Sequence, residues 1–423
     1  MTAINDRNPE MRSFFVLWTG QALSLLGSHG VQFALIWWLT QETGSAAVLA
    51  MAALLGLLPT VVLGPVIGAL VDRWDRKRIM LAADGLVALA SLVLAYLFSV
   101  GAESTRSVFV LLFLRGLGGA FHAPAMLAST SLMVPEQHLT RIQGLNQLLQ
   151  GGINIVAAPL GALLLALFPM GGVMLVDVGT ALLAIVPLLF IRVPQPAVAT
   201  GDANGAEVSL WGEMLAGFRY LAERRGHLIL IFMATLINLC LVPAFSLLPL
   251  LVSAQFDGNA LQLGWMSTGF GIGTIVGGIL LGVWGGFKRR VLTSLLALIG
   301  LGLSVVALGL APGYALALTA MILVGLTAPF ANGPISAILQ ATIAAEYQGR
   351  VFTLVGSLAA ATAPLGLLLA APVAELVGVR AWYVTGGLVC LAMGAVGFLL
   401  PPLLTIEGTR AEAQESDQAA LPV

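Results

Sequence analysis

The sequence is short of charge. Only 9% of its 423 residues are Asp, Glu, Lys or Arg, whereas 59% are hydrophobic. Soluble domains carry about 25% charged residues, which keep their surfaces hydrated. The shortage excludes an ordinary soluble protein, and the net charge of −1 excludes the broad basic field that nucleic-acid binding uses.

Cysteine is almost missing too. Cys240 and Cys390 both lie in apolar segments without a nearby partner or a metal-ligand spacing. This pattern excludes a disulfide framework and a cysteine-based zinc site, and it favours small packing residues. Short alternating apolar segments, which a membrane β-barrel would need, are also absent.

Long apolar runs are what the sequence does have. A membrane-spanning helix needs about 20 apolar residues, and runs of this length recur along the whole chain. We predict an all-α integral membrane protein with twelve transmembrane helices: Phe14–Leu39, Ala46–Val71, Ile79–Val100, Ser107–Val134, Leu145–Phe168, Met170–Ile191, Leu228–Val252, Leu263–Gly285, Val291–Leu310, Ala315–Ile343, Val351–Ala374 and Trp382–Leu400.

Lysine and arginine gather on one side of this predicted topology. Most of the 19 basic residues lie near the N-terminus, in the tail, or in the loops that follow even-numbered spans. Cytoplasmic loops carry the excess of basic residues in membrane proteins. We therefore predict a multi-pass protein of the bacterial cytoplasmic (inner) membrane, with both termini in the cytoplasm.

The chain divides into two six-helix halves. We expect an N-terminal half over 1–192, a cytoplasmic linker with an amphipathic helix over 193–226, a C-terminal half over 227–400 and a disordered cytoplasmic tail over 401–423. The halves repeat, since "APLG" at 158–161 recurs at 363–366 and Pro124 corresponds to Pro334. Parallel six-span repeats are typical of transporters that bind substrate between the halves.

One loop concentrates charge. "GALVDRWDRKR" (68–78) follows the second span, and "LRGLGGAF" (114–121) lies in the fourth. The first resembles the conserved loop motif of the major facilitator superfamily, and the second resembles the fourth-span motif of its drug:proton antiporters. "GRVFTL" (349–354) and the first-span stretch from Trp18 to Ala46 resemble Mef-type macrolide exporters.

The resemblance implies roles for the loop residues. The mixed charges would form a latch at the inner gate, in which Asp72 receives a helix N-terminus or an arginine; the alternative is that the basic residues only set topology. The implied gating residues are Gly68, Asp72, Arg73, Arg76 and Lys77. The fifth-span antiporter motif is matched only at Pro159, a departure that bears on antiport rather than on transport.

Ionisable residues inside spans are costly and generally functional. Arg115 and Asp177 lie at similar depths, counted from the outer ends of the fourth and sixth spans, so we predict that they form a charge pair. Asp84 lies nearer the cytoplasmic side, where it either joins the charge coupling or pairs with the basic loop. We assign proton coupling or charge pairing to Arg115, Asp177, Asp84 and His29. His122 is a further candidate proton carrier.

Polar side chains recur at helical spacing in spans one, four, seven and ten. These are the spans that line the cavity in the superfamily, although each polar side chain also fits an interhelical hydrogen bond. We predict that the following residues line a substrate cavity: Gln21, Ser24, Ser28, Gln32, His122, Met126, Asn238, Asn332, Ser336 and Gln340. No acid is expected on this cavity face.

The resulting prediction is a secondary active transporter. It would export a hydrophobic or amphiphilic small molecule, such as a macrolide-like drug, by proton-coupled alternating access. The alternatives are a siderophore or metabolite exporter and, in another class, a substrate-free scaffold or lipid scramblase. No nucleotide-binding loop or hydrolase motif occurs, so we expect no enzyme activity, no metal and no cofactor beyond the proton gradient. The expected partners are the substrate and the bilayer, without nucleic acid, and a monomer is expected.

Overall fold

The computed structural model describes residues 9–194, 218–221, 224–343 and 345–407, and these residues contain helices but no strand. Twelve of the helices are long and apolar enough to cross a membrane, which confirms the prediction of a twelve-span all-α protein. The elements are α1 (Pro9–Thr43), α2 (Ala46–Arg73), α3 (Arg76–Val100), α4 (Thr105–Met133), α5 (Glu136–Leu167), α6 (Met170–Phe190), α8 (Arg225–Ser246), α9 (Leu248–Phe256), α10 (Ala260–Trp284), α11 (Arg290–Leu310), α12 (Tyr314–Thr342), α13 (Ala345–Val377), α14 (Val379–Gly397) and α15 (Pro401–Leu404).

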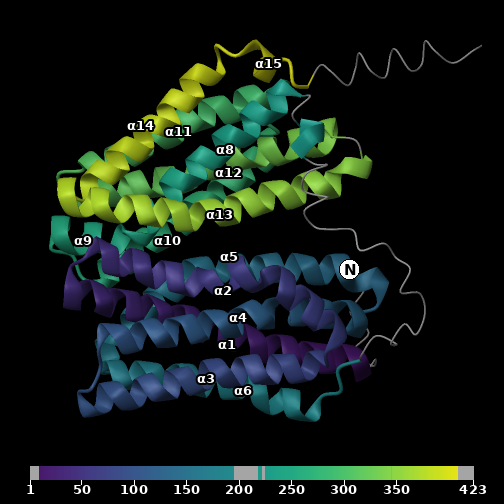
Figure 1. The fold of residues 1–423 in the computed structure, drawn as a ribbon, viewed down its shortest axis with the longest axis vertical. Coiled ribbons are helices and arrows are strands. Elements are labelled where there is room, and N and C mark those ends of the chain that lie inside the picture. The colour runs from purple at the N-terminus through teal and green to yellow at the C-terminus, as the bar shows by residue number, and fades with distance from the viewer. Residues whose placement is uncertain (1–8, 195–217, 222–223, 344, 408–423) are drawn as a thin grey trace, which may run out of the picture. The chain divides into compact units, whose positions relative to one another are not determined.

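Two compact units make up the chain (Figure 1). The first unit holds α1 to α6 together with residues 252–268. The second unit holds α8, the first residues of α9, α10 from Gly269 onward, and α11 to α15.

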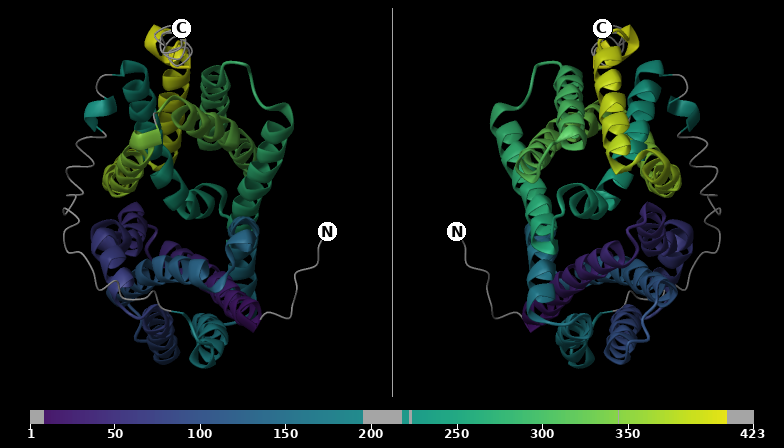
Figure 2. Two further views of the ribbon diagram at one scale, coloured as in Figure 1. Left: turned by 90° about the vertical axis from the view of Figure 1, so that its right-hand side faces the viewer. Right: turned by 90° about the vertical axis from the view of Figure 1, so that its left-hand side faces the viewer.

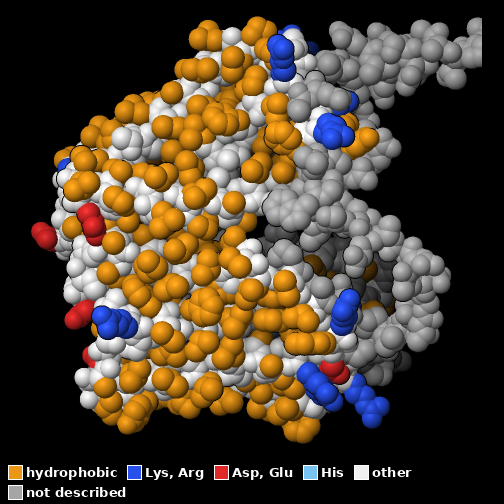
Figure 3. Space-filling view, in the orientation of Figure 1, with side chains coloured by type: hydrophobic (Ala, Val, Ile, Leu, Met, Phe, Trp, Pro, Cys, Tyr) orange, Lys and Arg blue, Asp and Glu red, His pale blue; other side chains and the backbone are white. Residues whose placement is uncertain are grey.

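The six helices of the first unit pack as a continuous series of neighbours. Helix α1 packs between α5 and α6, α6 packs against α3, α3 against α4, and α4 against α2. Figure 2 shows this unit from two further sides, with some of its helices viewed nearly along their axes. On the face of this unit that Figure 3 displays, hydrophobic side chains cover most of the surface and charged side chains lie near the helix ends, as a hydrocarbon solvent requires.

The second unit repeats this order of neighbours. Helix α8 packs between α13 and α14, α14 packs against α11, and α11 against α12. Helices α10 and α12 approach closely because Gly273 faces the backbone of α12 at Ile322. The sequence repeat therefore corresponds to the same packing order in both units.

Several helices extend beyond their apolar segments. Helix α3 begins at Arg76, α5 at Glu136 and α13 at Ala345, several residues before the predicted spans. Backbone hydrogen bonding continues wherever the chain permits it, whereas hydropathy marks only the part that lies in hydrocarbon. Asp75 starts α3 by accepting a 2.9 Å hydrogen bond from the backbone N–H of Arg78.

The seventh span is interrupted, which corrects the predicted continuous helix to Val252. Helix α8 ends at Ser246, and the short helix α9 begins at Leu248. Pro249 explains the break, because it has no N–H for the carbonyl of Phe245 and its ring restricts the preceding residue.

The start of the predicted tail differs from expectation. Residues 401–404 form α15 rather than a disordered segment, and Leu403 and Ile406 are buried. Two prolines at its start provide the fixed φ that suits a first helical turn. The predicted amphipathic helix falls largely outside the described residues.

Candidate functional site

An ion pair joins two helices inside the first unit. Arg115 of α4 donates through Nη1 to Oδ2 of Asp177, which lies on α6 and is fully buried. The same Asp177 oxygen accepts from Ser91 Oγ of α3 at 2.5 Å, and Oδ1 accepts from Ser28 Oγ of α1 at 2.7 Å. Four helices thus meet at one carboxylate, whose charge the guanidinium compensates.

A second polar group surrounds Asp84 of α3. Gln21 Nε2 of α1 donates to Oδ2 of Asp84 at 2.8 Å. His122 Nε2 of α4 lies 3.5 Å from the other carboxylate oxygen, is buried, and has no hydrogen-bond partner among the described residues. Asp84 therefore contacts side chains of α1 and α4, and its role in charge coupling stays a prediction.

These two groups form stacked layers. Three helices each contribute one residue to each layer, and the two residues on a helix are seven positions apart. The pairs are Gln21 and Ser28 on α1, Asp84 and Ser91 on α3, and Arg115 and His122 on α4. Seven residues are two helical turns, or about 10 Å. We name the first set (Ser28, Ser91, Arg115, Asp177) the outer layer and the second (Gln21, Asp84, His122) the inner layer, after the predicted topology.

A cavity of about 510 Å³ borders both layers. Its lining includes residues predicted for the cavity or for charge and proton coupling: Gln21, Ser24, Ser28, His29, Gln32, Asp84, Arg115 and His122. The expectation of a cavity without an acid is wrong, because α3 packs the face that carries Asp84 against α1 and α4.

Small residues let the helices around this cavity approach. A side chain at Gly116 would clash with the backbone oxygen of Gly56 on α2, and one at Gly118 would meet Val87 Cγ2 at 2.8 Å and Ala83 O at 3.0 Å. Close approach of α4 to both α2 and α3 brings polar side chains from separate helices within hydrogen-bond reach.

Other predicted residues lie elsewhere. Met126 packs against the apolar core of the first unit. Asn238 and Asn332 donate to carbonyls four residues earlier on their own helices, at 3.1 and 3.2 Å. Asn332, Ser336 and Gln340 share an exposed face of α12. Their role in a cavity stays a prediction.

Two predicted latch residues contact their own unit. Arg76 Nη1 donates to the carbonyl of Ala128 on α4, and Lys77 Nζ donates to the carbonyls of Leu189 and Ile191 at the end of α6, each at 2.8 Å. Arg73 is exposed, Gly68 has open space where a side chain would lie, and the side chain of Asp72 lies outside the described residues. The gating role stays a prediction.

Ser91 was missed by the sequence reasoning. It bridges Arg115 and Asp177 from α3 and is fully buried. A signal was present, since Ser91 follows Asp84 by two helical turns, as Ser28 follows Gln21. A single serine in an apolar span draws attention only once its neighbours are known.

Two units with the same helix order, together with polar residues buried around a cavity, define a membrane transporter with the major facilitator fold. The chain belongs to the family described as transmembrane secretion effector within that superfamily, whose pattern matches residues 9–420. It is accordingly a multi-pass transporter and not an enzyme.

Known relatives cover most of the chain. Macrolide efflux protein A of Streptococcus pyogenes is 36% identical over 385 residues, which are 90% of this chain and 94% of the relative. Multidrug efflux pump Tap of Mycolicibacterium fortuitum is 31% identical over 405 residues, which are 91% of this chain and 95% of the relative.

Solved structures share the fold at low identity. A bacterial homolog of the human lysosomal transporter Spinster, in an inward-facing and unoccupied conformation, superposes with a TM-score of 0.68 at 12% identity, covering 96% of this chain and 98% of that one. A peptide-bound transporter of the POT family gives 0.69 at 14% identity, covering 93% and 97%.

Proposed function

We propose that the chain exports hydrophobic or amphiphilic drugs of the macrolide type by alternating access. Similarity to macrolide efflux protein A along nearly the whole chain supports this substrate class. The observation that carries the proposal is the cavity of about 510 Å³, in which polar and apolar side chains surround a buried carboxylate.

The charge of the cavity favours a cationic substrate. Arg115 and Asp177 compensate each other in the outer layer. Asp84 in the inner layer contacts a neutral amide and a histidine, so its negative charge lacks a permanent counter-charge there. Macrolides are large, apolar cations, and an ammonium group would supply that counter-charge.

Proton coupling is assigned in this proposal to Asp84 and His122. A proton on either residue removes or neutralises the charge that attracts the cationic substrate, so protonation and drug binding compete. Competition of this kind shifts the populations of the two access states in opposite directions. The energy source would be the proton gradient, without a further cofactor.

The proposed setting is a bacterial cytoplasmic membrane, with both termini in the cytoplasm and a monomer as the working unit. The basic loops after even-numbered spans support this orientation. The latch of Asp72 with the basic cluster belongs to the same proposal, as the device that holds one access state.

Flux into proteoliposomes tests the proposal. The purified protein is reconstituted, a pH gradient is imposed, and uptake of a radiolabelled macrolide is followed with and without a protonophore. We expect gradient-driven uptake that falls at least tenfold in Asp84→Asn and persists in Lys288→Gln, an exposed change in the α10–α11 loop.

Three outcomes would contradict the proposal. Uptake that is unchanged by the protonophore would contradict proton coupling. Uptake that is unchanged in Asp84→Asn would contradict the role of Asp84 in binding a cationic substrate. Absence of macrolide uptake by folded protein, with transport of siderophores or metabolites instead, would replace the substrate class.

A further inference from the structure

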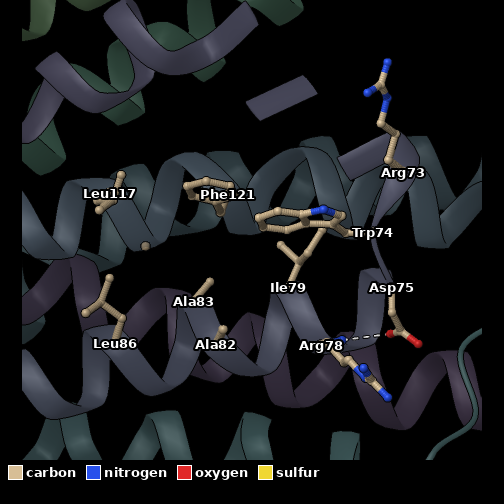
Figure 4. A pocket seen from close by; sticks show the side chains of 11 residues that line it. Arg73, Trp74, Asp75, Arg78, Ile79, Ala82, Ala83, Leu86, Leu117 and Phe121 are labelled. Atoms are coloured by element: carbon tan, nitrogen blue, oxygen red, sulfur yellow. Dashed lines mark hydrogen bonds between the residues drawn. The ribbon is translucent and has the colours of Figure 1, made fainter. Parts of the chain in front are cut away.

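A second groove lies on the first unit and shares two lining residues, Ala83 and Gly118, with the cavity described above. It has a volume of about 680 Å³ and is lined by the loop after α2 and by one side of α3 and α4. Figure 4 shows its apolar part, where Leu86 and Leu117 lie at one end and Phe121 lies beside Trp74. Ala82, which is exposed, leaves room along α3.

Charged side chains occupy the other end of the groove. Arg73 and Arg78 are exposed and point to opposite sides there (Figure 4). Neither guanidinium has a hydrogen bond or ion pair with any residue that the structure describes. Asp75 also lines this end, but its carboxylate caps α3 through the backbone N–H of Arg78.

The groove has the chemistry of a phospholipid site. Trp74 is 55% exposed, and tryptophan at a helix end marks the level of the lipid headgroups. Apolar side chains beneath that level suit acyl chains, while the two exposed arginines beside it suit a phosphate.

We propose that this groove binds an anionic phospholipid of the leaflet on the side of the α2–α3 loop. Its acyl chains lie between α3 and α4 along Ala82 and Leu117, and its headgroup lies at the end of the groove that carries Arg73 and Arg78. The proposal does not depend on the transported substrate, because a cation suited to Asp84 would meet two positive charges here.

Tryptophan quenching by brominated lipid tests the site. The full chain is placed in phosphatidylcholine nanodiscs that contain a small fraction of either brominated phosphatidylglycerol or brominated phosphatidylcholine. The chain has 8 tryptophans, so the quenching difference between the wild type and Trp74→Phe isolates Trp74. A basic residue near an anionic surface contributes about fivefold in affinity, so we expect phosphatidylglycerol to be preferred by roughly fivefold or more.

Matched variants separate the two parts of the site. Arg73→Gln with Arg78→Gln should reduce the preference to about one, whereas Lys288→Gln with Arg289→Gln, which removes the same charge at another exposed loop, should leave it unchanged. Ala82→Leu should lower the quenching of Trp74 by both lipids because it fills the groove. The single arginine variants should give intermediate preferences and replace the double variant if that does not fold.

Defined outcomes would overturn the proposal. Equal quenching by the two lipids in the wild type would show that the groove does not select an anionic headgroup. A preference retained without Arg73 and Arg78 would show that other residues bind the headgroup. Displacement of the lipid by millimolar glycerol phosphate would show that a soluble phosphate suffices and that the acyl chains are not held.

Discussion

Arg115 on α4 and Asp177 on α6 form a buried ion pair, and Ser91 on α3 hydrogen-bonds to both. The pair joins α4 to α6 through two residues that are 62 positions apart in the sequence. Arginine keeps its proton at all ordinary pH values, so this pair is suited to holding the first unit together.

Removing one partner of this pair should destabilise the unit. Asp177→Asn leaves the guanidinium buried without a counter-charge, which costs about 3–5 kcal/mol. The double variant Arg115→Gln with Asp177→Asn should recover part of the loss. Thermal unfolding in detergent, arranged as a double-mutant cycle, measures this coupling. If both single variants and the double variant lose stability additively, the two charges do not act as a pair.

Transport should depend on pH through the inner layer. A proton on His122 would place a positive charge 3.5 Å from Asp84 Oδ1. Acidification on the drug-binding side should then weaken drug binding, because the new positive charge compensates Asp84. The measurement is drug binding between pH 6 and 8 in the wild type, His122→Gln and His29→Gln. A pH dependence that survives in His122→Gln but not in His29→Gln would move the proton to His29.

The glycines of α4 should differ sharply in their tolerance of a methyl group. Gly116→Ala places a side chain against the backbone oxygen of Gly56, whereas Gly119→Ala meets nothing within 4 Å. We expect a loss of about 1–3 kcal/mol for the first. The second should be neutral or stabilising, because alanine favours helices by about 1 kcal/mol over glycine. Thermal unfolding of the two variants side by side decides this, and equal stability would argue against the close α2–α4 contact.

Lys77 should stabilise the end of α6. Its ammonium group donates to the carbonyls of Leu189 and Ile191, which have no partner within the helix and carry partial negative charge. Lys77→Ala should lower stability by about 1 kcal/mol, and Lys77→Arg should retain most of it. Lys288→Ala, at an exposed position, is the control in the same unfolding assay. An equal loss of stability in Lys77→Ala and Lys288→Ala would show that the hydrogen bonds of Lys77 to α6 do not stabilise the protein.

The inner layer shows where sequence reasoning reached its limit. Helical spacing placed Gln21 and Ser28 on one stripe, because the period of a helix is local. The same reasoning placed Asp84 only by its depth, since no pattern within α3 says which helix its face meets. Its contacts with Gln21 and His122 depend on how α1, α3 and α4 pack against one another.

Hydropathy by itself determined the twelve spans and the all-helical class, because water and hydrocarbon act on each segment separately, and recurring motifs in the sequence indicated the two-fold repeat. Tertiary packing alone decided that Asp84 borders the cavity, that Ser91 joins the Arg115–Asp177 pair and that Arg76 and Lys77 contact helices of their own unit. Those outcomes arise from contacts between segments far apart in the chain, where glycine-sized gaps and buried charges select one neighbour over another.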